Sequence, residues 1–503
     1  MVNFHYGESN LSTKLLTSLS NEISAPIKFT TKVIKRIESF RKIVDDAANS
    51  NDTHYGINTG FGLLADVKIS RDDLNQLQLN LVRSHACGVG DLTQLEATRS
   101  LLHLRLHTFC LGHSGISLEL AQKIAEFLEH DLMPVIPVQG SVGASGDLAP
   151  LAHMALAFIG EGEVFYRGSR YKTAEILKKL SITPVVLKPK EGLSLINGTL
   201  FMAALGSQCV EKAAVFATSA KLIFGLSLSA MRGSLTAFDE KIHSVRINPV
   251  QQSIAEFVRN LFLEHDAIME SHKNCGKVQD PYSFRCMPQV HGAFESCLNF
   301  ARQTVDQELN SVTDNPVVFE TGEILSGGNF HGQCLAQALD FLAISLTDVG
   351  SMIERRIEKL TNPVMSGLPA FLTKNSGLNS GFMMPHVTAA ALCSENKIYS
   401  HPASVDSIPT SADKEDHVSM GPAAATKCLR ILKNNFRILA IEAMAACQGI
   451  DLLAPLNPNP SLKKVYNEVR SVSKTYTEDR SLSAEIEKLA EFLEEGKLLA
   501  CLK

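Results

Sequence analysis

Long stretches of helical periodicity constrain the fold of this chain more than any other feature of its sequence. Apolar residues recur at helical spacing over residues 290–309 and again over residues 331–360, where Asn362-Pro363 stops the pattern. Residues 422–450 and 484–495 show the same periodicity. A helix of about thirty residues is about 45 Å long, which suits a helix bundle and not a doubly wound sheet. The sequence therefore predicts a mainly α fold built on long helices.

Shorter segments carry mixed signals. Asp91-Leu92-Thr93-Gln94 looks like a capping box, which predicts a helix ending near Gly112, and Ser117 predicts the start of the next helix. No disordered linker is evident, so the pattern gives no sharp domain boundary. The strand signals are short, and they are residues 135–138, 185–187 and 317–319.

The composition is that of an ordinary globular protein. Of the 503 residues, 45% are apolar and 20% are charged, and the formal net charge is −5. A mildly acidic surface attracts neither nucleic acid nor an anionic membrane, so we expect neither partner. The most apolar region, residues 200–231, is interrupted by Glu211, Lys212 and Lys221, which predicts a buried helix and not a membrane span.

Two features indicate the compartment. The eleven cysteines, an odd number, are scattered without a Cys-x-x-Cys pattern, which is typical of reduced thiols in a cytosolic protein. The first eight residues lack the basic start and apolar stretch of a secretory signal. We therefore expect a cytoplasmic protein.

The segment Gly143–Asp147 has the most unusual chemistry, because its backbone can react with itself. Attack of the Gly146 nitrogen on the carbonyl carbon of Ala144, with loss of water, closes a five-membered imidazolone. Loss of the Ser145 hydroxyl then leaves an exocyclic methylidene, an electrophile that no ordinary side chain supplies. Glycine has no Cβ, so its nitrogen can approach closely in a tight turn.

An Ala-Ser-Gly tripeptide alone is weakly specific, since a turn in which Ser145 or Asp147 caps a helix over residues 148–156 would also explain it. The surrounding residues Ser141–Pro150, however, resemble the prosthetic-group segment of the aromatic amino-acid ammonia-lyases, in which 4-methylidene-imidazol-5-one (MIO) forms autocatalytically. Matches in the family's order make the resemblance very specific, and they cover most of the chain. The other matching segments are Thr53–Gly62, Leu193–Thr199, Gln279–Cys286, Gly328–Gly332 and Ser411–Met420.

The resemblance carries expectations about fold and assembly. It implies a mainly α, ammonia-lyase-like fold with a smaller globular N-terminal head over residues 1–112. An elongated bundle of long helices follows over residues 113–503 and carries the MIO loop. The resemblance also implies a homotetramer in which three chains build each site, and a reaction that uses MIO from Ala144-Ser145-Gly146 without a metal or nucleotide cofactor.

Ammonia elimination must remove a weakly acidic β-proton and expel a poor leaving group, so it needs a base and an electrophile. The resemblance favours Tyr55 as the base, with Glu415 as the alternative. Arg285 is suited to clamp a substrate carboxylate through two hydrogen bonds. Structural alternatives stay open: ring packing for Tyr55, an ion pair for Arg285 and a tight Asn-Gly turn for Asn197. The candidates at the prosthetic ring and the substrate carboxylate are Tyr282, Asn197 and Gln279.

The substrate is indicated by the positions that would face its ring. In the family, Phe-Leu at one dipeptide goes with phenylalanine and His-Leu with tyrosine, whereas this chain has Ser84-His85, as the histidine-acting members do. Glu415 suits an imidazole, Met383 also matches the histidine type, and Phe330 is expected to pack on the substrate ring. The resemblance therefore implies elimination of ammonia from L-histidine, giving trans-urocanate.

Other interpretations deserve separate tests. An MIO aminomutase would use the same electrophile but return the amine to the β-carbon, and a helical scaffold with a degenerate site would do neither. His103 and His107 have the four-residue spacing of metal ligands, but the residues between them lack the glutamate of the zinc-protease motif. We therefore expect no metal site at this pair.

Overall fold

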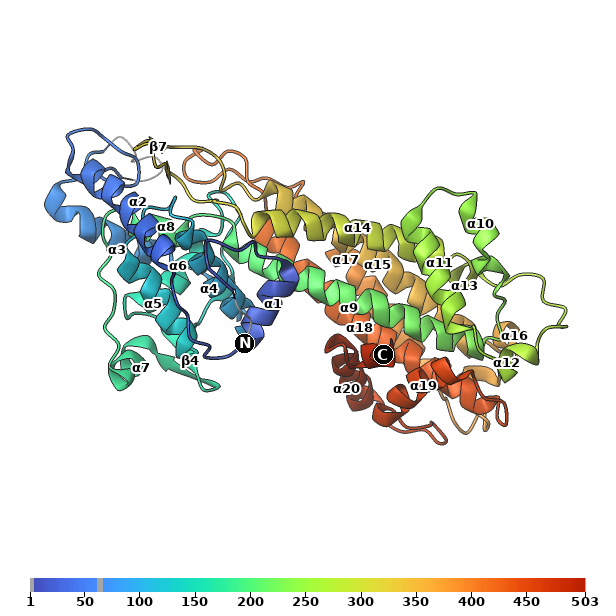
Figure 1. Ribbon diagram of the computed structural model, residues 1–503. Coiled ribbons are helices and arrows are strands. Elements are labelled where there is room, and N and C mark those ends of the chain that lie inside the picture. The colour runs from blue at the N-terminus through green and yellow to red at the C-terminus, as the bar shows by residue number, and fades with distance from the viewer. Residues whose placement is uncertain (1–3, 61–66, 503) are drawn as a thin grey trace. The chain divides into compact units, whose positions relative to one another are not determined.

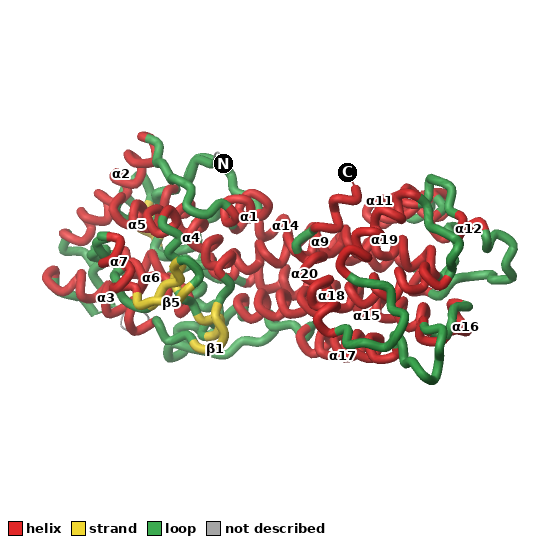
Figure 2. The backbone as a smooth tube through the Cα atoms, turned by 90° about the horizontal axis from the view of Figure 1, so that it is seen from below, coloured by secondary structure: helices red, strands yellow, loops and turns green. Residues whose placement is uncertain are grey.

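Helices dominate the computed structural model, which describes residues 4–60 and 67–502 (Figure 1). Figure 2, with helices in red and strands in yellow, shows that the strands are few and short. The mainly α fold predicted from the long periodic segments is therefore confirmed. Phe61 and Gly62, at the end of the Thr53–Gly62 segment, lie outside the described residues.

Contacts divide the chain into two units. Unit 1 comprises Met1–Cys209, Ala301–Asp340 and Pro402–Thr426. Unit 2 comprises Val210–Phe300, Phe341–His401 and Lys427–Lys503. The predicted boundary between residues 112 and 113 stays a prediction. The long helices that contribute residues to both units are α9 (Leu200–Ala230), α14 (Met287–Glu308), α15 (Gln333–Thr361) and α18 (Gly421–Leu452).

Unit 1 combines short helices with small antiparallel sheets. β1 pairs with β3, β4 lies between β2 and β5, and β6 pairs with β7. Its helices are α1 (Thr13–Asn21), α2 (Thr31–Asn49), η2 (Arg71–Asp73), α3 (Leu74–His85), α4 (Leu95–Cys110), α5 (Leu118–Glu129), α6 (Leu148–Phe158), α7 (Thr173–Leu180) and α8 (Glu191–Ile196). Its strands are β1 (Val89–Leu92), β2 (Met133–Pro134), β3 (Pro137–Gln139), β4 (Glu163–Tyr166), β5 (Ser169–Lys172), β6 (Val317–Val318) and β7 (Ile324–Leu325).

Helix α4 is the central buried helix of unit 1. Every residue from Ala97 to Cys110 is buried, and α4 packs against both α1 and α5. Helices α3, α6 and α8 pack against one another. Helix α6 is almost entirely apolar and fixes the end of the loop that follows β3. Helix α8 is entirely buried and fixes the start of the loop that follows it.

Unit 2 is built almost entirely from helices. The helix α9, which enters it, is long and apolar enough to cross a membrane by length and composition alone, but 78% of its most apolar window is buried inside the protein. The predicted buried helix over residues 200–231 is thus confirmed. The other helices of unit 2 are η3 (Thr236–Phe238), α10 (Glu240–Ser244), α11 (Pro249–Leu261), α12 (Ala267–Glu270), α13 (Tyr282–Arg285), α16 (Pro363–Ser366), η4 (Ala370–Leu372), α17 (Met383–Tyr399), α19 (Pro460–Val472), α20 (Ser483–Glu494) and η5 (Lys497–Leu502).

Predictions from short local signals were less accurate than predictions from the long periodic segments. Ser117 caps α5 as predicted and accepts the Leu120 N–H at 3.3 Å. The capping box at residues 91–94 is wrong, because Val89–Leu92 pairs with β3 as a strand and α4 starts without a side-chain cap. The strand signal at 317–319 is confirmed in β6. The signal at 135–138 begins after β2 and overlaps only the start of β3, and residues 185–187 form no strand.

Candidate active site

The turn around Ser145 has a backbone that only glycine can complete. It follows β3 and precedes α6, and Gly146 has a φ of +77°. A Cβ built on Gly146 would lie 2.0 Å from the carbonyl oxygen of Gly198, so no side chain fits there. The Asp147 N–H donates to that same oxygen at 2.8 Å. The loop that follows α8 thus presses directly against the reactive turn.

Both oxygens of Ser145 are held by hydrogen bonds. Its hydroxyl donates to Oε1 of Glu415 at 3.0 Å. Its carbonyl oxygen accepts from Nδ2 of Asn197 at 3.2 Å and from the backbone N–H of Gly198 at 3.3 Å. Two donors on one carbonyl oxygen stabilise negative charge there, as in an oxyanion hole.

Glu415 is fixed by its own loop. Oγ1 of Thr410 donates to Oε2 of Glu415 at 2.7 Å, and the two residues also exchange backbone hydrogen bonds of 3.0 and 3.3 Å. Between them, Ser411, Ala412 and Asp413 all have left-handed backbones, with φ of 54°, 52° and 63°. Left-handed non-glycine residues are costly and are common at functional sites. The hydrogen bonds with Thr410 keep the Glu415 carboxylate against the Ser145 hydroxyl.

A buried charge supports the opposite side of the turn. Arg105 of α4 is fully buried and donates to the carbonyl oxygens of Ser194 at 2.8 Å and Asn197 at 3.0 Å. Burial lowers the pKa of Arg105 to about 10, so it stays protonated at neutral pH. Burial also raises the pKa of Asp147 to about 7, and its Oδ2 accepts the Met202 N–H at 3.0 Å. Asp147 does not cap α6 through its side chain, contrary to the structural alternative considered for this turn.

A cavity of about 550 Å³ in unit 1 opens onto this turn. It brings together residues from five of the six matching segments and from Ser84-His85. The predicted site residues that line it are Tyr55, His85, Ala144, Ser145, Asn197, Phe330 and Glu415. Gly146 adjoins Ser145 beneath the cavity.

His85, the last residue of α3, lines this cavity. Its Nδ1 lies 2.9 Å from the carbonyl oxygen of Leu81, which only accepts hydrogen bonds. The Ser84 hydroxyl also lies 3.1 Å from Nδ1. With the proton on Nδ1, the tautomer that suits the Leu81 carbonyl oxygen, Nε2 is an acceptor. The side chain is suited to receive an N–H from a polar ring in the cavity.

The cavity also contains residues that the sequence analysis did not identify as site residues. His331 and His417 stack face to face, with ring centroids 5.6 Å apart and planes 3° apart. Leu81, Leu148, Leu193 and Ile196 form apolar parts of the wall. His331 and His417 fall inside matching segments, whereas Arg105, which supports the site from outside, carries no local sequence signal.

Four predicted site residues belong to unit 2 and do not line this cavity. Tyr282 is 69% exposed, and Met383, the first residue of α17, is 39% exposed. The Arg285 guanidinium stacks 4.3 Å from the centre of the Tyr282 ring and makes no ion pair within the described residues. Gln279 lines a separate cavity of about 600 Å³.

His103 and His107 have structural partners. Nδ1 of His103 is 2.7 Å from the Tyr6 hydroxyl, and Nδ1 of His107 accepts the Gly7 N–H at 3.2 Å. Burial lowers the pKa of His103 to about 3 and that of His107 to about 4, so both rings are neutral at neutral pH. Within residues 4–60 and 67–502, no group of three or more His, Cys, Asp or Glu side chains is placed to hold a metal ion.

Comparison with known proteins identifies the family of the chain. The family model "Aromatic amino acid lyase" matches residues 11–471. Over 498 residues, the chain is 46% identical to histidine ammonia-lyase of Myxococcus xanthus, covering 99% of this chain and 97% of that protein.

Solved structures show the same relationship. The crystal structure of histidine ammonia-lyase from Trypanosoma cruzi has a TM-score of 0.90 and 43% identity, covering 99% of this chain and 94% of that one. Tyrosine aminomutase from Streptomyces globisporus has a TM-score of 0.92 and 36% identity, covering 99% of this chain and 97% of that one. Because the family model and these relatives span nearly the whole chain, the protein belongs to the aromatic amino acid lyase family.

Proposed function

We propose that this protein eliminates ammonia from L-histidine to give trans-urocanate, using an MIO group that forms from Ala144-Ser145-Gly146. The observation that carries the proposal is the environment of Ser145. Its hydroxyl is held by Glu415, its carbonyl oxygen by Asn197 and Gly198, and its neighbour Gly146 leaves no room for a side chain.

These residues fit the prosthetic group. The Gly146 nitrogen and the Ala144 carbonyl are the atoms that ring closure joins, and Ser145 carries the hydroxyl that is lost. Once formed, the group supplies an electrophilic carbon that captures a nucleophilic atom of the substrate and so assists loss of the amine. Asn197 Nδ2 and the Gly198 N–H, which donate to the Ser145 carbonyl oxygen, would hold the group and would stabilise negative charge on that oxygen.

Removal of the β-proton needs a base, and the cavity offers Tyr55 and Glu415. Tyr55 lies on the loop over residues 53–60, where Asn58 accepts the His54 N–H at 2.7 Å and donates to the Asp52 carbonyl at 2.9 Å. Glu415 is fixed by Thr410. Comparing Tyr55→Phe with Glu415→Gln separates the two roles.

Recognition of the imidazole ring falls to three side chains of the cavity. Nε2 of His85 accepts an N–H, Glu415 pairs with an imidazole or imidazolium, and Phe330 packs on the ring face. Met383 adds an apolar contact. A benzene ring would leave the polar atoms of His85 and Glu415 without partners, which disfavours phenylalanine and tyrosine.

The substrate carboxylate requires a cation, and Arg285 is suited to this role together with Tyr282 and Gln279. Arg285 makes no ion pair within the described residues and stacks on the exposed Tyr282 ring. We propose that these residues and Met383 complete the cavity of a neighbouring chain in a homotetramer. The eleven cysteines form no disulfide within the described residues, which agrees with a cytoplasmic location.

The test is absorbance at the urocanate band after mixing the protein with L-histidine, with L-phenylalanine and L-tyrosine as controls. Urocanate from histidine alone is the expected result. A β-amino acid as the product would indicate an aminomutase, and no turnover of any of the three would indicate a site that has lost its chemistry.

A further inference from the structure

The backbone just before α17 is held only partly by its own residues, since the Met383 N–H donates to the Ser380 carbonyl oxygen at 3.3 Å. Gly381 has a φ of +58°, and a Cβ built there would lie 2.3 Å from the carbonyl oxygen of Phe371. The Phe382 N–H donates to that same oxygen at 2.8 Å. Phe382 is the N-cap of α17 and makes no side-chain cap hydrogen bond. The position of Met383, the first residue of this helix, therefore also depends on contacts from outside residues 380–383.

Asp479 provides these contacts. Its carboxylate accepts the Ser380 N–H at 2.7 Å and the Gly381 N–H at 3.0 Å. In return, the Asp479 N–H donates to Oδ1 of Asn379 at 3.1 Å. The two backbone donors lower the pKa of Asp479, so its carboxylate stays charged. A negative charge at this end of α17 also suits the helix dipole.

Tyr476 orients Asp479. Its hydroxyl donates to Oδ1 of Asp479 at 3.1 Å and accepts the Arg480 N–H at 3.1 Å. The Tyr476 ring meets the Phe382 ring edge to face, with centroids 5.6 Å apart. One residue of the segment 473–482, which we call the C-terminal loop, thus contacts both the carboxylate and the residue before Met383.

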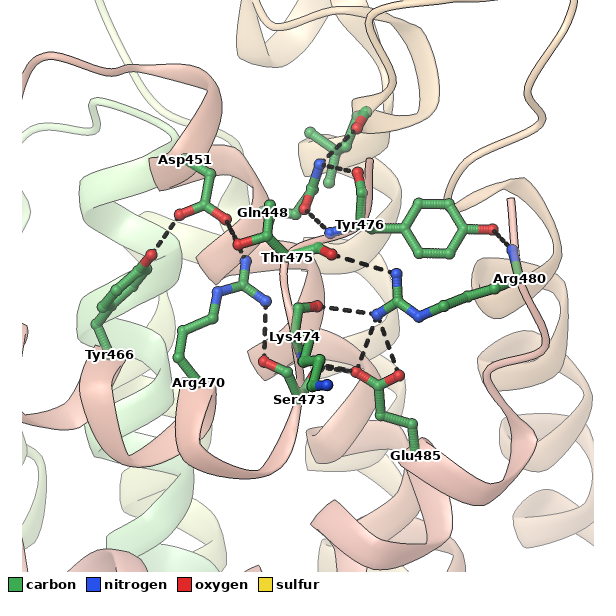
Figure 3. Close-up of polar contacts among 11 residues, drawn as sticks. Gln448, Asp451, Tyr466, Arg470, Ser473, Lys474, Thr475, Tyr476, Arg480 and Glu485 are labelled. Carbon is green, nitrogen blue, oxygen red and sulfur yellow. Dashed lines mark hydrogen bonds and ion pairs between the residues drawn. The ribbon is translucent and has the colours of Figure 1, made fainter. Parts of the chain in front are cut away.

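The C-terminal loop is anchored to α18, as Figure 3 shows. Gln448 of α18 accepts the Tyr476 N–H and donates to the Tyr476 carbonyl, both at 2.9 Å. The same amide nitrogen of Gln448 donates to the Leu372 carbonyl at 3.2 Å. The Gln448 side chain therefore joins the C-terminal loop to Leu372. Leu372 follows Phe371, whose carbonyl oxygen lies next to Gly381.

Two further sets of contacts, made by Arg480 and by Asp451, stabilise the C-terminal loop at a distance from α17. Arg480 pairs with Glu485 and donates to the carbonyls of Thr475 at 3.2 Å and Lys474 at 3.0 Å (Figure 3). Asp451 accepts from Thr475 at 2.8 Å, from Arg470 at 2.7 Å and from Tyr466. None of these contacts reaches residues 379–383, so they stabilise the loop without touching the backbone before Met383.

We propose that Asp479 is a positioning residue for substrate binding, which fixes the Ser380–Gly381 backbone and thereby the Met383 side chain. This proposal rests on the proposed function, in which Met383 contacts the histidine ring. Methionine is a flexible side chain and Met383 is 39% exposed, so the position of its backbone strongly influences where the side chain lies. Loss of Asp479 leaves the chemistry intact and weakens the grip on the ring.

The test compares KM and kcat for L-histidine in Asp479→Ala and Asp479→Asn. Loss of an apolar ring contact costs about tenfold in binding, so we expect KM to rise about tenfold in Asp479→Ala with kcat changed less than about threefold. Asp479→Asn keeps one acceptor and should give an intermediate KM. Asp451→Asn is the matched control, because it weakens the same loop on its far side and should lower Tm without raising KM.

The double variant with Met383→Ala decides whether Asp479 acts through Met383. In that background Asp479→Ala should change KM less than about twofold. A tenfold rise that persists there, an equal rise in Asp451→Asn, or an unchanged KM in Asp479→Ala while the wild type is active, overturns the positioning role alone. A wild type that does not convert histidine overturns the proposed function, and the positioning role with it.

Discussion

The turn around Ser145 and the helix that carries Tyr282 and Arg285 are held in opposite ways. Both oxygens of Ser145 have partners within the chain, and a Cβ on Gly146 would clash with backbone. Tyr282 is 69% exposed, and Arg285 has no ion pair within the described residues. We infer that formation of the electrophile needs only one folded chain. Binding of the substrate carboxylate, in contrast, needs Arg285 and Tyr282 to meet the substrate in the cavity of a neighbouring chain.

The largest expected effect comes from breaking the well-held turn. Gly146→Ala forces a Cβ against the Gly198 carbonyl and displaces the N–H that donates to Ser145, so ring closure fails. We expect urocanate formation to fall by at least about a thousandfold. Gly168→Ala is the matched control, since Gly168 has a φ of +78° but nothing within 4 Å. Equal activity in both variants would show that the close approach is not needed.

The next effect concerns the loosely held helix. Arg285→Lys keeps the charge but loses the planar pair of donors that matches a carboxylate. We expect kcat/KM for L-histidine to fall by about ten- to a thousandfold, with Tm unchanged. Tm distinguishes the two roles of Arg285, because loss of a structural ion pair would lower the Tm of the protein without substrate. Wild-type kinetics in this variant would return Arg285 to a surface role.

A smaller effect is expected for ring recognition. Replacing Ser84-His85 by Phe-Leu removes the acceptor at Nε2, which costs about 1–3 kcal/mol in histidine turnover. Phenylalanine turnover should appear weakly and should rise when Glu415→Gln is added, because an unpaired carboxylate no longer faces an apolar ring. The measurement is kcat/KM for both substrates in the double and triple variants. An undiminished preference for histidine in both would remove His85 from ring recognition.

The last prediction concerns stability and not turnover, and it tests the scaffold beneath the turn. His103 and His107 lie on α4, the helix that also carries Arg105, and burial lowers their pKa values to about 3 and about 4. The unfolded chain binds these protons near pH 6.5, so stability is complete above that pH and falls as pH decreases. The slope is about 1.4 kcal/mol per pH unit for each histidine. Urea denaturation at pH 7 and pH 5 measures it, and His103→Gln and His107→Gln should each flatten the dependence.

Long-range periodicity was the most reliable guide to the fold. The segments 290–309, 331–360, 422–450 and 484–495 correspond to α14, α15, α18 and α20 within a few residues. Burial of a long apolar face requires this pattern, so the pattern predicts the helix. The capping box at residues 91–94 failed because cross-strand pairing of β1 with β3 competes for the same residues. A local signal does not register such a distant partner.

The sequence predicted residues that meet at the turn around Ser145, but it did not predict the residues that hold them in place. Ser145, Asn197 and Glu415 come together as the matching segments implied. Arg105 and Thr410 were not predicted, because a buried arginine on a helix and a threonine in a polar loop have no sequence pattern of their own. Their importance arises from tertiary contacts with the Asn197 carbonyl and the Glu415 carboxylate. The placement of Tyr282, Arg285, Gln279 and Met383 at the site stays a prediction.

The most direct test of the central claim is the intact mass of the purified protein. Ring closure and loss of the Ser145 hydroxyl each release one water, so the wild type should be lighter than its sequence by two waters. Ser145→Ala should fold with the wild-type Tm, lack the second loss and be nearly inactive. A wild-type mass equal to that of the unmodified chain would contradict the account, however well the turn around Ser145 is held.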